Sequence, residues 1–164
     1  GSDLRELSAA CSQLASDVAL QKTIDEEDVI AYQQGRVEST GFDVADAAVE
    51  GNTPIAIINL RNALATGTDP VLIVSALASS FRTLAKVSGA SRSVKSFELA
   101  QSMAIPPWQI DKARRQLVGW SENAMAKAVI AIAAADADIK GAAADPIYAL
   151  ERAIMTVCAA RGSR

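Results

Sequence analysis

Three dipeptides in which an oxygen-bearing side chain precedes proline constrain the fold of this chain more than any other feature. They are Thr53-Pro54, Asp69-Pro70 and Asp145-Pro146, and each stands directly before an apolar run with helical spacing. An oxygen at the N-cap accepts hydrogen bonds from free amides of the first turn, and proline suits the first helical position because its nitrogen carries no hydrogen. The three pairs therefore predict three helix starts.

Glycines mark the expected helix ends. Gly51, Gly67, Gly119 and Gly141 each follow a periodic run, where a left-handed residue often ends a helix. Together with apolar residues three and four apart, they predict helices over residues 3–18, 25–34, 42–50, 54–66, 70–88, 94–103, 107–118, 122–140 and 146–161. The first turns of 70–88 are apolar on nearly all sides, which is typical of a central helix. We predict an all-α protein, a helical bundle without a sheet.

Composition restricts the function. Among 164 residues, half of them apolar, there is no histidine, and the cysteines, Cys11 and Cys158, lie at opposite ends. Histidine is the usual general base and the commonest metal ligand, and the cysteine spacing fits neither a disulfide framework nor a metal site. The chain also lacks a GxxxxGK[ST] phosphate loop. We expect no catalytic, cofactor or metal site, and no enzymatic activity in this chain by itself.

Because the cysteines form no disulfide framework, a reducing cytoplasm is the expected location. No uninterrupted apolar run approaches the ~20 residues of a membrane span, and the start has no basic-then-apolar secretion signal. We expect no membrane contact. The opening Gly1-Ser2 is interpreted as the remainder of an expression tag.

Residues 35–41, GRVESTG, break the helical pattern and predict a domain boundary. Residues 1–52 hold 11 acidic and 3 basic side chains, whereas residues 53–164 hold 8 acidic and 13 basic ones. The first predicted helix carries an apolar stripe that one short neighbouring helix cannot cover. The stripe consists of Leu4, Leu7, Cys11, Leu14 and Val18. We interpret this first part as a piece of a larger bundle.

The first candidate site is the connection ADADIKGAAADP, residues 135–146. Asp136 and Lys140 are four residues apart with the acid first, which favours an intrahelical ion pair, and Lys140 faces the negative end of the helix dipole. Asp136 also continues an apolar stripe of Met125, Val129, Ile132 and Ile139. We therefore expect a partly or fully buried carboxylate, paired with Lys140, Arg152 or an amide of the next helix. A structural hairpin is favoured over a catalytic pair, because no nucleophile accompanies these residues.

The second candidate site is FELAQSMAIPPWQIDKARRQ, residues 97–116, in which a short helix, a turn at Ile105-Pro106 and a second helix outline a helix-turn-helix. From Arg82 to Arg115 there are 7 bases and 2 acids, enough for a basic patch that binds DNA. The candidate residues of this patch are Arg82, Lys86, Lys112, Arg114 and Arg115.

The second helix of this segment argues against DNA recognition. It begins with Pro107-Trp108, where a recognition helix usually presents polar side chains to base edges. Its expected buried face consists of Trp108, Ile110, Ala113 and Leu117. Trp108 and Trp120 are both expected to fill the core. A helix-turn-helix DNA-binding protein remains the rival hypothesis.

Four stretches in fixed order resemble one protein family. They are GFDVADAAVEGN (41–52), ALASSFRTLAKV (76–87), ELAQSMAIPPWQIDKARRQLVGWS (98–121) and ADADIKGAAADPIYALERAI (135–154). Residues 41–164 resemble the carboxy-terminal collar domain of the delta subunit of the bacterial DNA polymerase III clamp loader, in its actinobacterial form. Residues 3–34 resemble the last two helices of the AAA+ lid domain that precedes the collar in that family.

The resemblance implies an organisation and a function. Residues 1–40 would be the end of the lid domain, and residues 41–164 a helical collar of about seven helices. The collar would hold the delta subunit beside the gamma/tau and delta-prime subunits, as a non-catalytic part of the polymerase III holoenzyme that helps to load the sliding clamp. The clamp contact would lie in an upstream domain absent from this chain, and DNA would be met only within the complex.

The resemblance also gives the first candidate site a structural role. The connection between the last two collar helices would act as a hairpin clasp without chemistry. The residues of this clasp are Asp136, Lys140, Gly141, Asp145, Pro146 and Glu151.

Overall fold

The computed structural model describes residues 4–17, 23–91, 93–142 and 145–162, and this part of the chain contains helices and connections but no strand. The predicted all-α fold is therefore confirmed. By packing, the chain divides into two compact units, Gly1–Ser39 and Thr40–Arg164.

The first unit contains α1 (Leu4–Asp17) and the beginning of α2 (Glu26–Val49). Asp25 and Asp28 start α2 by capping each other, since each backbone N–H donates to the other side chain at 3.2 and 3.1 Å. The expected uncovered stripe of α1 is present: Leu4 is 80% and Leu7 57% exposed. Val18, the last residue of that stripe, lies outside the described residues, as do Gly1 and Ser2.

The predicted helix break at residues 35–41 is wrong, because α2 continues from Glu26 to Val49. A glycine inside a helix costs about 1 kcal/mol relative to alanine, which tertiary packing can offset. Gly41 is buried, and a Cβ placed there would meet the Cβ of Ala76 on α4 at 3.4 Å. Its missing side chain thus permits a close approach of two helices, and it does not end one.

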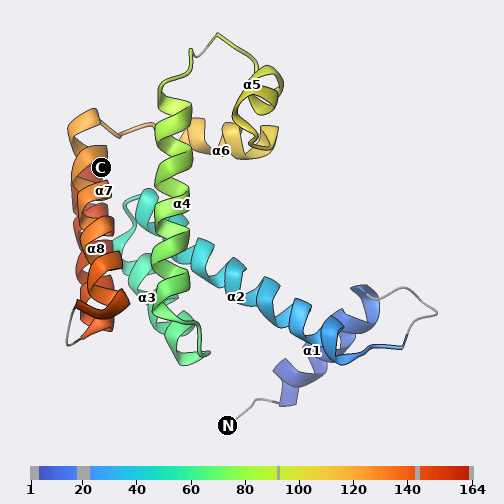
Figure 1. Ribbon diagram of the computed structural model, residues 1–164. Helices are drawn as coiled ribbons and strands as arrows, with labels where there is room; N and C mark the ends of the chain where they lie inside the picture. The colour runs from blue at the N-terminus through green and yellow to red at the C-terminus, as the bar shows by residue number, and fades with distance from the viewer. Residues whose placement is uncertain (1–3, 18–22, 92, 143–144, 163–164) are drawn as a thin grey trace. The chain divides into compact units, whose positions relative to one another are not determined.

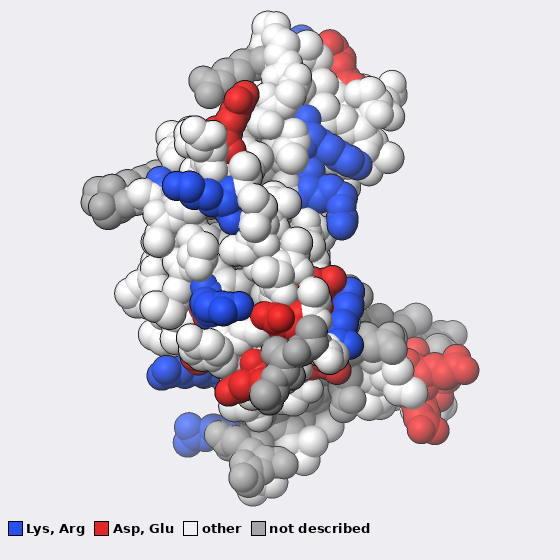
Figure 2. All heavy atoms as spheres, turned by 60° about the vertical axis from the view of Figure 1, so that its left-hand side comes forward, with Lys and Arg blue, Asp and Glu red and all other residues white. Residues whose placement is uncertain are grey.

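The second unit continues with α3 (Thr53–Ala65), α4 (Pro70–Ser88), α5 (Ser96–Met103), α6 (Pro107–Gln116), α7 (Glu122–Ala137), the π-helical turn η1 (Asp138–Ala142) and α8 (Pro146–Arg161). Figure 1 shows α4 running through the middle of this unit, with α7 and α8 side by side along it. Helices α5 and α6 pack on each other near the end of α4. Figure 2 shows charged side chains of both signs, separated by broad uncharged areas.

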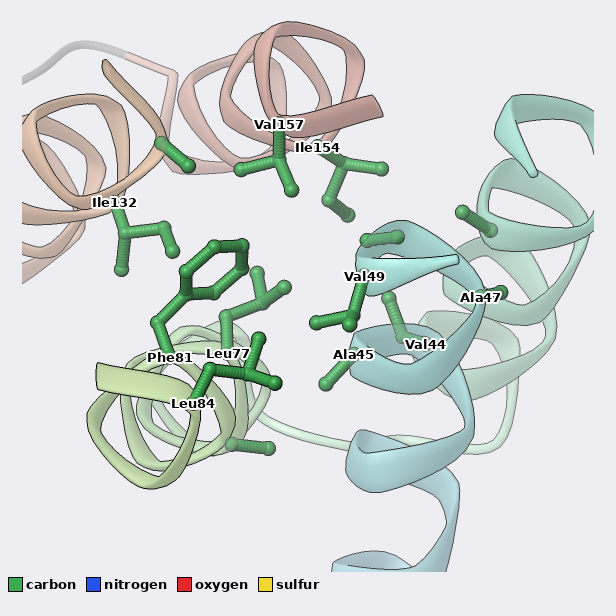
Figure 3. Packing of buried hydrophobic residues seen from close by; sticks show 14 of the residues in the cluster. Val44, Ala45, Ala47, Val49, Leu77, Phe81, Leu84, Ile132, Ile154 and Val157 are labelled. Carbon is green, nitrogen blue, oxygen red and sulfur yellow. The ribbon is translucent and has the colours of Figure 1, made fainter. Parts of the chain in front are cut away.

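The core lies where α4 meets α2, α7 and α8. Figure 3 shows the ring of Phe81 between α4 and the helices opposite, with Leu77 and Leu84 beside it. The residues that meet them are Val44 and Val49 of α2, Ile132 of α7, and Ile154 and Val157 of α8, all almost fully buried. Helix α4 matches a membrane span by length and by its mean hydropathy of 1.4, and it alone does so among the described residues. Its burial in this core accounts for its apolar character, as the prediction of a central helix requires.

The local chemistry of helix starts and ends follows the prediction with one correction. Asp69 Oδ1 accepts from Val71 N at 2.8 Å, and Asp145 Oδ1 accepts from Tyr148 N at 2.9 Å. At α3 the cap is Asn52, one residue before the predicted Thr53, and its Oδ1 accepts from Ile55 N at 3.3 Å. The four predicted stop glycines all have positive φ, as left-handed helix ends require.

Candidate functional site

The hairpin between α7 and α8 contains the predicted ion pair. Lys140 Nζ lies 2.8 Å from Asp136 Oδ1, and the side chains are 55% and 38% exposed. The carboxylate is partly buried, which is within the predicted range. Of the expected stripe, Met125, Ile132 and Ile139 pack on the core, whereas Val129 is 44% exposed. Helix α7 also buries Ala124, Ala128 and Ala135.

A second ion pair joins the hairpin to the final helix. Arg152, predicted as one partner for Asp136, instead places Nη2 3.2 Å from Asp138 Oδ2 of η1. Its guanidinium also lies 5.9 Å from the centre of the Tyr148 ring, within the range of a cation–π contact. Both ion pairs lie at the surface, where each contributes about 0.2–1 kcal/mol.

The other predicted clasp residues have separate positions. Gly141 kinks the chain with φ 136°, Asp145 caps α8 and Pro146 is the first residue of that helix. Glu151 does not reach across the hairpin, because its Oε1 lies 4.0 Å from Arg61 Nε of α3. No group of three or more metal-binding side chains occurs in the residues that the structure describes.

The segment proposed as a helix-turn-helix consists of α5, a short connection and α6. Ala104 in this connection has φ 53°, which allows the tight turn. On α6, Ile110 and Ala113 are buried as predicted, but Trp108 is 62% exposed, so its predicted burial is wrong. Trp108 stands two positions before Ile110, and residues two apart lie on opposite sides of a helix.

Two of the three predicted basic residues of α6 bind within the fold. Lys112 Nζ forms an ion pair with Asp46 of α2. The guanidinium of Arg114 donates to the carbonyl oxygen of Val94 at 2.6 Å and to Ser96 Oγ at 3.2 Å. Both side chains therefore hold this part of the fold together.

The predicted basic residues do not line one common surface. Lys112 and Arg115 line a polar pocket of about 580 Å³ together with Glu50 and Arg161. Arg82 lines a different hollow, between α4 and α7, of about 610 Å³. Lys86 is exposed on α4.

A hydrogen-bond network centred on Asp46 was not predicted. Besides Lys112, it binds Gln116, whose Nε2 donates to Asp46 Oδ1 at 3.1 Å and whose side chain is buried. This network joins α2 to α6. Its partners lie 66 and 70 residues away in the chain, so helical spacing carries no signal of it.

A second unpredicted group of hydrogen bonds caps the carbonyl end of α2. Arg161 donates from Nη1 to the carbonyl oxygen of Val49 at 3.0 Å and from Nη2 to that of Val118 at 2.9 Å. Trp120 Nε1 donates to the same Val49 oxygen at 3.0 Å, and its ring packs edge-on against Phe81 at 5.1 Å. The expected core position of Trp120 is thus largely correct, since its side chain is half-buried.

Between α4 and α7 the surface is hollowed along most of α7. One hollow, of about 870 Å³, lies where the ends of α4 and α6 meet the start of α7. The hollow that contains Arg82 continues from it, because Val129 lines both. We call the two together the α4–α7 groove. It holds no constellation of reactive groups, but its apolar lining suits another helix.

Two of three comparisons relate the chain to known proteins. Residues 38–157 match the family model of the DNA polymerase III delta subunit, C-terminal domain. The fold is similar to that of the Bacillus subtilis DNA clamp loader delta protein (YqeN), with a TM-score of 0.67 and 17% sequence identity. That match covers 94% of this chain and 46% of the Bacillus protein, so this chain spans about half of its length. No curated protein matches the sequence.

The family match covers most of the second unit, including α4, α6, α7 and the hairpin. The all-α architecture agrees with it, because the similar fold of the Bacillus protein extends over nearly the whole chain. The chain belongs to the family of DNA polymerase III delta subunits, in which it contains the C-terminal domain.

Proposed function

We propose that this chain is the assembly part of a clamp-loader delta subunit, which it holds beside the gamma/tau and delta-prime subunits. The match of residues 38–157 to the delta C-terminal family carries this proposal. Within the complete complex, the delta subunit would take part in loading the sliding clamp onto primed DNA. This chain would be a non-catalytic part of the polymerase III holoenzyme, in the cytoplasm.

The two units have different proposed roles. Residues 41–164 would be the collar, and residues 1–40 the end of an AAA+ lid domain. The exposed Leu4 and Leu7 support the second assignment, since a lid helix separated from its bundle would leave its apolar stripe uncovered. Contact with the sliding clamp would require the upstream part of the delta subunit.

The hairpin residues would act as a structural clasp in this scheme. Two ion pairs, Asp136 with Lys140 and Asp138 with Arg152, support that role, because both lie at the turn between α7 and α8. Gly141 and Pro146 would fix the path of the turn. Glu151 would contribute through α3, on the other side of α8.

DNA recognition by residues 97–116 is the alternative function. The helix-turn-helix outline favours it, but Lys112 and Arg114 are bound within the fold. A recognition helix needs free side chains at the base edges, and the exposed start of α6 offers Trp108 there. We therefore favour assembly, with DNA contact only as part of the complex.

The test mixes the purified chain with gamma/tau and delta-prime subunits and follows co-elution by size-exclusion chromatography. Assembly predicts a complex that contains the chain. Duplex binding is then measured at low and physiological salt, with Arg115→Ala as the variant that removes a free base of α6. Failure to co-elute, together with sequence-dependent duplex binding that Arg115→Ala weakens, would favour the DNA-binding alternative.

A further inference from the structure

The lining of the α4–α7 groove combines small residues with large apolar side chains. The small residues include Ala78 and Ala85 of α4, Gly89 directly after it, and Ala126 and Ala133 of α7. Small side chains leave room, so that a third helix can approach the two helices that form the groove. Helix packing distances of about 8–10 Å depend on the side chains at the contact in this way.

The groove contains large apolar side chains that remain exposed in the fold. Ile130 is 69%, Val118 59% and Val129 44% exposed, and all three line the groove. The groove follows α7 from Glu122 to Asp136, a length of roughly 21 Å at 1.5 Å per residue. This length corresponds to about four helical turns, enough for a docked helix to present two or three apolar side chains.

The charged side chains of the groove also restrict which kind of helix can bind there. Arg82 lines the middle of the groove and is exposed, and the described residues offer it no hydrogen bond or ion pair. Lys86, one turn further along α4, lines neither hollow, and the acidic Glu122 lines the other end of the groove. The carboxylate of Asp136 in the same hollow as Arg82 is already bound by Lys140. An acidic side chain on the occupant would therefore meet an uncompensated positive charge.

We propose that the α4–α7 groove receives an amphipathic helix of an adjoining clamp-loader subunit, with apolar side chains toward Val129 and Ile130 and a carboxylate opposite Arg82. This inference rests on the proposed assembly function and adds the surface and the chemistry of the contact. A nucleic-acid backbone would also satisfy Arg82. It would, however, leave the apolar walls facing a polar ligand.

The experiment measures affinity of the whole chain for a purified mixture of gamma/tau and delta-prime subunits. The variants are Ile130→Lys, which puts a charge on the apolar wall, and Arg82→Glu, which reverses the central charge. Lys127→Glu is the matched control, because it is an equally exposed charge reversal on α7 that does not line the groove. All of these side chains are exposed, so circular dichroism and the unfolding midpoint should match the wild type.

We expect Ile130→Lys and Arg82→Glu each to weaken binding about tenfold or more, as for truncation of an interface hot spot. Arg82→Lys should retain most of the affinity, and Lys127→Glu should bind like the wild type. Wild-type binding should also weaken with salt more steeply than that of Arg82→Ala.

Three outcomes would overturn the inference. If the wild type enters the complex and both groove variants bind as tightly as the wild type, the groove is not the binding surface, but the assembly function is still supported. If the wild type does not bind the subunits, both the groove inference and the proposed assembly function are wrong. If Ile130→Lys only abolishes a concentration-dependent dimer seen by sedimentation, the occupant is a second copy of this chain.

Discussion

Replacing Asp46 by alanine should destabilise the second unit more than any other single loss of charge in α2. The carboxylate accepts from Gln116 at 3.1 Å and forms an ion pair with Lys112, and both partners belong to α6. Its side chain is 29% exposed and that of Lys112 36% exposed, whereas Gln116 is only 8% exposed. Loss of the carboxylate would therefore leave Gln116 with a buried amide and Lys112 with a partly exposed ammonium group.

The expected magnitude is a sum over these two partners. A buried amide without an acceptor costs about 1–3 kcal/mol. Gln116 is 8% exposed and lies at the edge of the polar pocket that Lys112 and Arg115 line. An ion pair at this exposure contributes about 0.2–1 kcal/mol, and Lys112 can turn toward solvent. We expect Asp46→Ala to lower the free energy of unfolding by the sum of the two, about 1.2–4 kcal/mol.

Two variants separate the contributions. Asp46→Asn keeps an oxygen for Gln116 and removes only the charge, so it should cost about 0.2–1 kcal/mol. Lys112→Met keeps the aliphatic stem and should cost a similar amount. In the double-mutant cycle of Asp46→Ala with Lys112→Met, the coupling should equal the ion-pair contribution.

The assay is urea unfolding, followed by circular dichroism and tryptophan fluorescence, with the dependence on urea required to stay constant between variants. The reasoning is refuted if Asp46→Asn costs as much as Asp46→Ala. In that case the charge, and not the acceptor for Gln116, would stabilise the junction of α2 and α6. A cost of Asp46→Ala below about 0.5 kcal/mol would contradict the burial of the amide.

Four further predictions concern other groups. Asp136→Ala should cost at most about 0.5 kcal/mol in urea unfolding, because the pair with Lys140 is a half-exposed intrahelical one; a cost above 1 kcal/mol would imply an enclosed carboxylate. Arg161→Gln should lose about 1.5–3 kcal/mol, since its guanidinium binds the carbonyl oxygens at the ends of α2 and α6, and an unchanged unfolding midpoint would contradict this. In the native chain a thiol reagent should label the exposed Cys11 and spare the buried Cys158 until urea unfolds the protein. Burial raises the pKa of Cys158 above its ordinary 9.0, so its contribution to stability should be complete below pH 9 and decline at higher pH, as unfolding scans across that range would show.

The parts of the fold that were predicted depend on chemistry within one or two turns of chain. Asp69 and Asp145 cap the helices that their prolines begin, and Gly141 lies where a left-handed residue was expected. The ion pair of Asp136 with Lys140 is equally local. For such features the sequence neighbours and the spatial neighbours are the same.

The parts that were not predicted depend on which helix lies opposite. In the sequence, Gly41 indicates the end of a helix, because its close approach to Ala76 of α4 is a long-range contact that the local pattern does not contain. On α7, Met125, Ile132 and Ile139 of the expected stripe pack on the core, but Val129 is 44% exposed, because helical spacing does not say where a neighbouring helix ends its cover. The error on Trp108 has another cause: residues two apart lie on opposite sides of a helix, so Trp108 and Ile110 could not share the buried face of α6.

The hydrogen bonds at the end of α2 also determine when this unit can fold during protein synthesis. Arg161 binds the carbonyl oxygen of a residue 112 positions earlier, and Cys158 packs on a carbonyl 110 positions away. At about 5–20 residues per second, a ribosome needs roughly 6–22 s to synthesise the chain between them. During that interval the apolar face formed by Val44 and Val49 has no α8 to cover it. The nascent chain must therefore spend seconds with part of its future core accessible to chaperones, and ordering of the second unit waits for its last helix.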